Sequence, residues 1–362
     1  MDRGKIHSLN PIHVIGLIIN SMVGVNLLSL SHFASKMGYN LWMAPILLGI
    51  IVTLTVFPMI ALCSRYPGDT LFGIHEKLLG KWLGSCLNVL VIVYAILNTS
   101  TANEGYVRLL QTSMLNNQTI TMPLLGLTLV MMYITNGGIK LVARFCLLAL
   151  FFTGWMLVLL HYGFQKGGLS HIFPLFNTDL ASVLDALNQS SGSMLGYEIL
   201  LIYYPFIIEK NRARRHVLIG VWTVVFFYVL VLLTSVAYFS EWQVANLVYP
   251  ILNLFKAVEL SFLERVENLG IGLWVFLILS TSTAYLWMAR TGMEQLAGKR
   301  RLWHLLLPSA ISYFMIRGPL SVEAQRYLYD QLTVYFAYGL ILWPIFLLML
   351  HALRRGKGEK VS

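Results

Sequence analysis

Charged side chains are scarce in this chain. Asp, Glu, Lys and Arg together make up 12% of its 362 residues, whereas about 25% is typical of a soluble domain. Hydrophobic residues make up 57%, and the mean hydropathy is +0.70. The chain lacks the polar surface that a water-soluble fold requires, so a soluble globular protein is excluded.

Cysteines and catalytic motifs are also few or missing. Cys63, Cys86 and Cys146 fall in or beside hydrophobic segments without metal-binding spacing, so we expect buried core thiols. The sequence contains no GxxxxGK[ST] loop, no HExxH and no GxSxG. These absences exclude an ATP drive within the chain and weigh against a membrane enzyme. We expect no cofactor and no metal site.

Long apolar stretches are abundant. About 20 mostly apolar residues cross a bilayer as a helix, and backbone polar groups cannot be left bare in lipid. The pattern therefore predicts an all-α membrane protein, a single domain over 1–362. Its ten transmembrane helices are expected at about 11–33, 41–63, 83–108, 121–137, 141–162, 184–208, 216–239, 270–291, 302–318 and 331–352.

The predicted loops carry two further patterns. The amphipathic stretch 70–80 predicts a helix lying at the membrane interface. Apolar residues at helical spacing within 240–268 predict short helices over the outer face.

Positive charges are distributed unevenly between these loops. With the N-terminus in the cytoplasm, 19 of the 26 Lys and Arg residues lie on the inner side and 7 on the outer side. The positive-inside rule then places both termini in the cytoplasm. This topology and attraction to the lipid bilayer explain the net charge of +10, so we expect no nucleic-acid partner.

Small and polar residues interrupt two of the predicted helices, the first at Gly24 and the sixth around Gly196. The sixth helix follows the first by five, an odd number, so the two halves have opposite topology. Matched glycine-interrupted helices indicate a 5+5 inverted-repeat transporter fold with discontinuous helices 1 and 6. The alternative is close helix packing by small residues. The repeats are expected at about 10–162 and 184–352, with a cytoplasmic tail at 353–362.

Glu198 lies near the middle of the sixth helix, directly after its glycine-rich break. An ionised carboxylate at the bilayer centre is costly, so it must face a cavity, find a partner or be protonated. One interpretation is that Glu198 lines or closes an ion or proton path. The other is that it hydrogen-bonds to the loosened backbone and holds the break in shape.

Polar residues also gather on the third and eighth helices. On the third, residues three and four apart share one face, and Glu104 precedes Arg108 at a favourable ion-pair spacing. This face either lines an outer path or carries a self-satisfied pair. On the eighth, the hydroxyls either contact a substrate or cation or bond their own backbone. The residues are Tyr94, Asn98, Thr101, Gly105 and Arg108 on the third helix, and Ser280 to Thr283 with Tyr285 on the eighth.

Ten helices with breaks in the first and sixth resemble the amino acid–polyamine–organocation transporters. Within that superfamily, several segments are similar to those of the spore germination permeases, and the likeness runs over essentially the whole chain. The segments are Gly196-Tyr197-Glu198 with Pro205, Tyr249-Pro250 leading through Lys256 to Phe262-Leu263-Glu264-Arg265-Val266-Glu267, Pro174, and the Pro67-Gly68 turn.

The resemblance implies a B subunit of a nutrient germinant receptor in the inner membrane of bacterial spores. It implies two partners, a larger A subunit and a C-subunit lipoprotein. It also implies a small-molecule nutrient, commonly an amino acid, bound mid-membrane. Family contacts come from helices 1, 3, 6 and 8. The matching positions are Gly24, Val25, Asn98, Thr101, Met194, Gly196, Tyr197, Thr281, Thr283 and Tyr285.

These positions hold no basic side chain for a substrate carboxylate. In the superfamily, exposed amides of an unwound helix take that role, and we expect the regions of Gly24 and Gly196 to supply them. Glu198 would lead to an inner ion or proton path, and Glu104 with Arg108 to an outer one. Three hypotheses stay open: a nutrient receptor subunit, a proton- or sodium-coupled amino acid transporter, and a ligand-gated ion or water channel.

Overall fold

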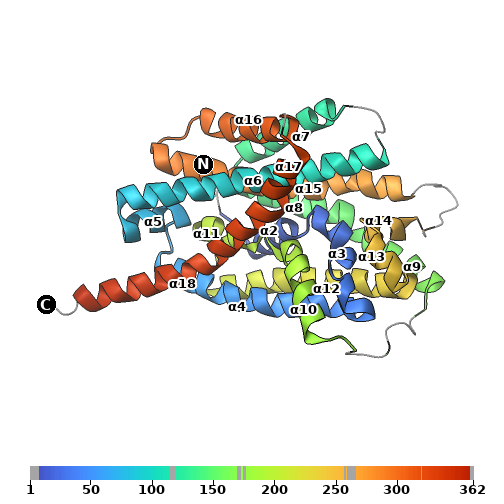
Figure 1. Ribbon diagram of the computed structural model, residues 1–362. Helices are drawn as coiled ribbons and strands as arrows, with labels where there is room; N and C mark the ends of the chain where they lie inside the picture. Colours follow the sequence, from blue (N-terminus) through green and yellow to red (C-terminus); the bar gives the residue numbers. More distant parts are fainter. Residues whose placement is uncertain are drawn as a thin grey trace.

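The computed structural model describes residues 8–114, 119–168, 173, 177–256, 258, 266–318 and 320–358. Within these ranges the chain is helical, and the β-type pairing is one isolated bridge between Leu9 and Ile207. The long helices run along a common direction, as Figure 1 shows. The predicted all-α class is thereby confirmed.

The first half of the chain forms three long helices, a bent helix pair and shorter elements. The η elements here are 3-10 helices. In order they are α2 (Pro11–Met22), η1 (Val25–Ser29), α3 (Leu30–Phe33), η2 (Ser35–Met43), α4 (Ala44–Arg65), α5 (Leu71–Leu79), α6 (Lys81–Ser113), α7 (Thr121–Asn136), α8 (Ile139–Gly154), η3 (Trp155–Leu159) and α9 (Leu160–Lys166).

The second half contains a segment of short helical pieces, followed by longer helices. All η elements are again 3-10 helices except η9, which is a π-helix. In order they are α10 (Leu180–Ser190), η5 (Ser191–Met194), η6 (Tyr197–Ile199), α11 (Leu200–Tyr203), η7 (Tyr204–Phe206), η8 (Lys210–Arg212), α12 (Ala213–Tyr238), α13 (Glu241–Asn246), α14 (Pro250–Phe255), α15 (Val266–Ala297), α16 (Trp303–Arg317), α17 (Val322–Arg326), η9 (Tyr327–Leu332) and α18 (Thr333–Gly358).

Six helical segments in the described residues are long and apolar enough to cross a bilayer, and the bent pair from α2 to α3 makes up to seven. Each of the ten predicted stretches overlaps a helix. A multi-pass membrane protein is therefore supported, whereas the count of ten crossings stays a prediction. At the C-terminus, α18 continues to Gly358, through the first part of the expected tail.

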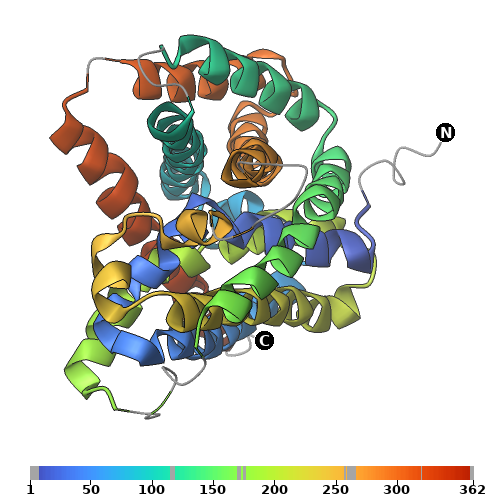
Figure 2. The ribbon, with the colours of Figure 1, turned by 90° about the vertical axis from the view of Figure 1, so that its right-hand side faces the viewer.

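Two sets of long helices form the core. α15 packs along α6, α8 and α7, while α12 packs along α2 and α4. Figure 2 views α6 and α15 nearly end-on, with α7 and α16 crossing beside them. Small residues permit the closest approach: a Cβ at Gly220 of α12 would lie 2.8 Å from the Cβ of Ile18 on α2.

The expected short helices are present. α5 covers the stretch predicted to be amphipathic, and α13 and α14 lie within the loop that follows α12. α5 buries its apolar face against α6, and Gly80 (φ 83°) makes the turn between them. The family-like segment 262–265 and Pro174 lie outside the described residues.

His75 fixes α5 to two transmembrane segments. The indole N–H of Trp343, on α18, donates to Nε2 of His75 (2.8 Å), and Nδ1 of His75 is 2.8 Å from Oδ1 of Asn88 on α6. Because Nε2 accepts, the imidazole is neutral and its proton lies on Nδ1. Burial lowers the pKa of His75 from 6.5 to about 4, against a smaller opposing effect of the Asn88 hydrogen bond.

The pKa of His75 predicts a loss of stability in acid. The neutral imidazole stabilises the fold fully above about pH 6.5, and this contribution falls as the pH drops toward 4. The shift corresponds to roughly 3 kcal/mol. We expect His75→Gln to flatten this part of the thermal-unfolding profile measured in detergent between pH 4 and pH 7. His161→Gln, at an exposed histidine on α9, is the control, and parallel profiles for His75→Gln and wild type would contradict the assignment.

Candidate functional site

The breaks predicted in the first and sixth helices are present, and they touch one another. α2 ends at Met22 and η1 begins at Val25, with a bend of 53° between the two helices. In the sixth segment, η5 ends at Met194 and Gly196 adopts φ +116°, a conformation that favours glycine. A Cβ at Gly196 would lie 2.0 Å from the carbonyl oxygen of Ser21. Gly196 is therefore required both by its backbone and by the contact between the breaks.

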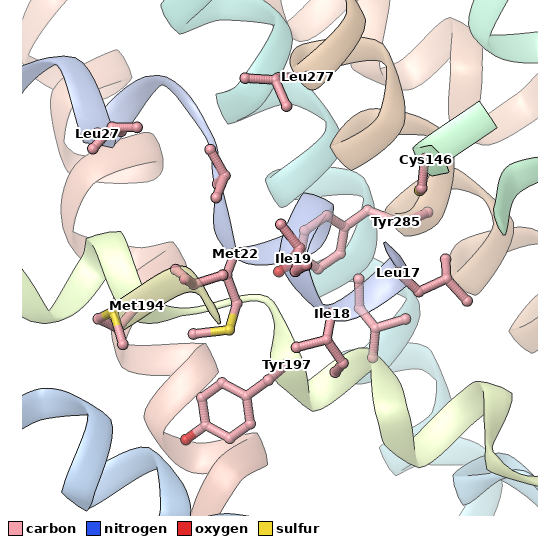
Figure 3. Packing of buried hydrophobic residues seen from close by; sticks show 14 of the residues in the cluster. Leu17, Ile18, Ile19, Met22, Leu27, Cys146, Met194, Tyr197, Leu277 and Tyr285 are labelled. Carbon is pink, nitrogen blue, oxygen red and sulfur yellow. The ribbon is translucent and has the colours of Figure 1, made fainter. Parts of the chain in front are cut away.

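Tyr228, on α12, hydrogen-bonds to both breaks. Its hydroxyl lies 3.1 Å from the carbonyl oxygen of Met22 and 3.1 Å from that of Ser193. A second link is the side-chain amide of Asn26, which donates to the carbonyl of Gly192 (3.4 Å). Carbonyl groups freed by the breaks thus find donors inside the protein, as they must in lipid. Figure 3 shows Met22, from the first break, and Met194, from the second, at this junction between the two breaks.

Asn20 fixes the first helix to α8 and α15 just before its break. Its side-chain amide donates to the carbonyls of Gly16 and Cys146, both at 2.9 Å. Its side-chain oxygen accepts from the hydroxyl of Ser280 (2.9 Å), and its backbone carbonyl accepts from Thr281 (2.7 Å). Two of the four hydroxyls on the eighth predicted helix therefore bind the first helix.

Glu198 is fully buried and accepts three hydrogen bonds. The hydroxyls of Tyr94 (2.5 Å) and Tyr285 (2.7 Å) donate to Oε1, and the backbone amide of Gly196 donates to Oε2 (2.8 Å). Among the described residues, no Lys, Arg or His forms an ion pair with it. The carboxyl group of Glu198 joins α6 and α15 to the second break. These contacts are those expected of a side chain that holds the break in shape.

These contacts bear on the amides that the regions of Gly24 and Gly196 are expected to supply. The amide of Gly196 is not exposed for a ligand carboxylate, because Glu198 already accepts its hydrogen. The first break differs. Val25 begins a helix, so its amide and that of Asn26 have no acceptor within that helix. A Cβ placed on Gly24 would meet nothing within 4 Å, so open space lies beside the first break.

A cavity of about 610 Å³ borders the first break. A Cβ at Gly105 on α6 would lie 3.5 Å from Val25, so these two segments adjoin there. Arg108 pairs with Glu104 and also donates to the side-chain oxygen of Gln325 on α17. The cavity lining contains two carboxylates, two guanidinium groups and one imidazole, that of His32. The lining residues are Val25, Asn26, Ser29, His32, Phe33, Glu104, Gly105, Arg108, Val248, Tyr249, Gln325, Arg326, Tyr329 and Asp330.

The π-helical turn η9 faces this cavity. Tyr329, within η9, lines the cavity, and its buried hydroxyl has no hydrogen-bond partner among the described residues. π-helical turns are rare and occur frequently at functional sites. The wall formed by α17 and η9 was missed by the sequence analysis, because no composition signal marks a π-helix.

The structure brings together part of the predicted ligand set. Gly196 and Tyr285 meet at Glu198, and Thr281 binds the first helix. Met194 and Tyr197 are buried nearby, and the Tyr197 hydroxyl lies 2.7 Å from that of Thr55 on α4.

The side chains of three other predicted residues bond along their own helices. Asn98 and Thr101 are half-buried, and their side chains donate to carbonyls one turn earlier on α6. The hydroxyl of Thr283 donates to a carbonyl of its own helix, and the Thr283 carbonyl accepts from the hydroxyl of Thr135 on α7 (3.5 Å). Thr283 therefore lies against α7. Their roles in ligand binding stay predictions.

Two residues at the junction were missed. Asn20 was visible as a polar residue in the first helix, but its partners lie far away in sequence. Tyr228 sits in a long apolar run, where it looks like an ordinary core aromatic.

The paired breaks within a multi-pass helical bundle define a permease-like membrane protein. The structure of MhsT in complex with L-phenylalanine has this fold: the TM-score is 0.65 at 16% identity, over 92% of this chain and 88% of that one. The model of the spore germination protein family matches residues 8–320, and the chain belongs to this family. It is 27% identical to spore germination protein GerQB of Bacillus cereus over 86% of both chains. It is 23% identical to spore germination protein A2 of Bacillus subtilis (strain 168) over 96% of both.

Tyr228→Phe tests the junction. Losing the hydroxyl leaves two buried carbonyls without their donor, which costs about 1–3 kcal/mol. We expect a lower unfolding temperature in detergent. Tyr203→Phe is a matched control, because the buried Tyr203 hydroxyl has no partner in the described part of the chain. Equal stability of the two variants would show that Tyr228 does not hold the breaks together.

Proposed function

We propose that this chain is the membrane subunit of a spore nutrient germinant receptor. It binds a small nutrient within the membrane at the helix breaks, and binding triggers germination. Family membership supports the role in germination. The observation that carries the binding site is the cavity beside the first break, where unpaired helix amides adjoin charged side chains.

The cavity suits a small polar molecule such as an amino acid. Amides at the start of a helix attract a carboxylate, because the positive end of the helix dipole lies behind them. Those amides belong to Val25 and Asn26. Glu104, on α6, and Asp330, in η9, line the same cavity and offer carboxylates for an ammonium group. Three predicted ligand positions belong to the same segments: Gly24 directly precedes η1, and Asn98 and Thr101 lie on α6 with Glu104.

Binding acts as a signal by favouring one conformation. A ligand shifts an equilibrium only by its difference in affinity for the two states. Closure of η1 and η9 over the nutrient would bring such a difference. Glu198 transmits it, because its carboxylate joins the second break to Tyr94 on α6 and Tyr285 on α15. In this proposal, Glu198 leads to the inner path, and Glu104 with Arg108 to the outer one.

The setting follows from the same proposal. The chain forms ten transmembrane helices in a 5+5 inverted repeat, with both termini cytoplasmic, in the spore inner membrane. An A subunit and a C-subunit lipoprotein are its partners. No enzymatic activity is proposed, since the relatives bear the names of spore germination proteins.

Glu198→Ala tests the signalling role. Removing the carboxylate frees Tyr94, Tyr285 and the Gly196 amide, so the second break loses its link to α6 and α15. In spores that contain the variant at the wild-type level, we expect the germination response to the nutrient to disappear.

Glu198→Gln refines this test, because it keeps a hydrogen-bonding side chain of the same size without the charge. Glu323→Ala, at an exposed glutamate on α17, is the control and should respond normally. A normal response from stably expressed Glu198→Ala spores would reject the role of Glu198.

A coupled amino acid transporter is the second candidate, because the fold is shared with MhsT, whose structure contains L-phenylalanine. Counterflow in proteoliposomes that contain this chain alone separates the two. The receptor proposal predicts ligand binding without exchange of labelled amino acid, and co-purification with the A and C subunits. Robust exchange would favour the transporter. Conductance across the same membranes would favour a ligand-gated channel.

A further inference from the structure

A second cavity, of about 200 Å³, lies where α15 meets the turn between α7 and α8. Its most buried charged residue is Arg290, on α15, which is 4% exposed. Arg300, in the segment after α15, lines it with a side chain that is 51% exposed. The cavity therefore has an inner and an outer guanidinium group. The lining residues are Thr135, Gly138, Ile139, Phe206, Trp287, Arg290, Thr291, Glu294 and Arg300.

The cavity lies toward the end of the bundle where hydrogen bonds join α5 to the ends of α15 and α18. Gln295, near the end of α15, donates to Glu76 of α5 (3.1 Å). Arg354, near the end of α18, donates to the backbone carbonyl of Lys77 (3.4 Å). In Figure 1, α5 and the end of α18 lie at the same end of the molecule. Basic side chains at such an end attract anionic lipid surfaces.

The charges within the cavity do not cancel. Glu294 is the one acid among its lining residues, and its Oε1 lies 2.8 Å from Nε of Arg290 and 3.6 Å from Nε of Arg300. Two guanidinium groups face one carboxylate, which leaves one positive charge. The remaining contacts are neutral: Arg290 donates to Asn136 (3.1 Å) and Thr135 (3.5 Å), and Arg300 donates to the Asn136 carbonyl (3.0 Å).

The first turn of α8 adds further donors. Gly138 (φ 79°) precedes the helix, and both Gly138 and Ile139 line the cavity. The amide of Ile139, the first residue of α8, has no acceptor within the helix. The continuous span from Ile139 to Lys166 directs the positive end of its dipole here.

The opposite wall is apolar. Phe206 and Trp287 pack edge to face with ring centroids 5.7 Å apart, and both line the cavity. A free inorganic anion gains nothing from such a wall. An amphiphile whose charged group sits between the guanidinium groups, with an apolar portion against the rings, uses both walls.

We propose that this cavity binds the phosphate group of an anionic phospholipid from the surrounding bilayer. The phosphate lies between Arg290, Arg300 and the amide of Ile139 at the start of α8, and the glycerol and upper acyl chain lie against Phe206 and Trp287. The bound lipid joins α15 to the α7–α8 turn. This site is separate from the cavity beside the first break, and the proposal does not depend on the proposed function.

The experiment uses the purified full chain in neutral phosphatidylcholine nanodiscs. Dioctanoyl phosphatidylglycerol is titrated and its affinity measured by native mass spectrometry, with dioctanoyl phosphatidylcholine and inorganic phosphate as parallel probes. Arg300→Gln is compared with Arg301→Gln, which removes the same charge from the next, exposed residue outside the cavity. Each basic residue near an anionic membrane contributes about 1 kcal/mol, or roughly fivefold in affinity. We expect Arg300→Gln to weaken phosphatidylglycerol binding at least fivefold more than Arg301→Gln.

Arg300→Lys keeps the charge but loses the planar fork, and it should fall between wild type and Arg300→Gln. Because Arg300 is half exposed, these variants leave the core intact. Equal losses in Arg300→Gln and Arg301→Gln would overturn the site in favour of diffuse attraction. Equal affinity for phosphatidylglycerol and phosphatidylcholine would overturn it as well. Binding of inorganic phosphate as tight as that of the lipid would retain the anion site but overturn the assignment to lipid.

Discussion

The fold depends on how the backbone groups released by two broken helices are satisfied inside a membrane. Water cannot serve them in the hydrocarbon, so protein donors and acceptors must. Tyr228 donates to carbonyls from both breaks, Asn20 accepts from α15 while donating to α8, and Glu198 takes the amide of Gly196. These three side chains determine which helices surround the junction. Four elements, α6, α8, α12 and α15, are held there because each supplies or receives one of these bonds.

The backbone groups at the two breaks are satisfied to different degrees, and this asymmetry bears on the proposed function. At the second break, the Gly196 amide is paired and a Cβ on Gly196 would lie 2.0 Å from the carbonyl oxygen of Ser21, so little space remains. At the first, Gly24 borders open space, and the helix that starts at Val25 faces a cavity. A ligand can therefore add bonds at the first break without displacing any. Movement of the second break must exchange existing bonds at Glu198, and such an exchange between discrete arrangements is what a switch requires.

Much of the architecture could be predicted from the sequence, because it rests on local signals. Apolar length predicts the helices, Gly24 and Gly196 predict the breaks, and the amphipathic pattern predicts α5. The bonds at the junction could not be predicted. Tyr228 lies in an apolar run, and Asn20 binds residues more than a hundred positions away. The bond from the Gly196 amide to Glu198, two residues later, could not be predicted either. Such pairings depend on three-dimensional proximity, which periodicity and composition do not encode. A ligand role for the other amides of the Gly196 region stays a prediction.

Two helices, α6 and α15, connect the junction between the breaks to the two charged cavities. On α15, Tyr285 binds Glu198, and Arg290 lines the cavity of about 200 Å³. Tyr285 and Arg290 are five residues apart, or about 7.5 Å along the helix. On α6, Tyr94 binds Glu198, and Arg108 lines the cavity beside the first break. Tyr94 and Arg108 are fourteen residues apart, or about 21 Å along the helix. Because an α-helix transmits displacement along its axis with little compression, a shift of α6 at one cavity must either move Tyr94 relative to Glu198 or carry Glu198 with it. In the second case Tyr285 is drawn along, and Arg290 moves against the α7–α8 turn. The phospholipid proposed at that turn would oppose this movement, and in that proposal the lipid composition biases the equilibrium between the two conformations.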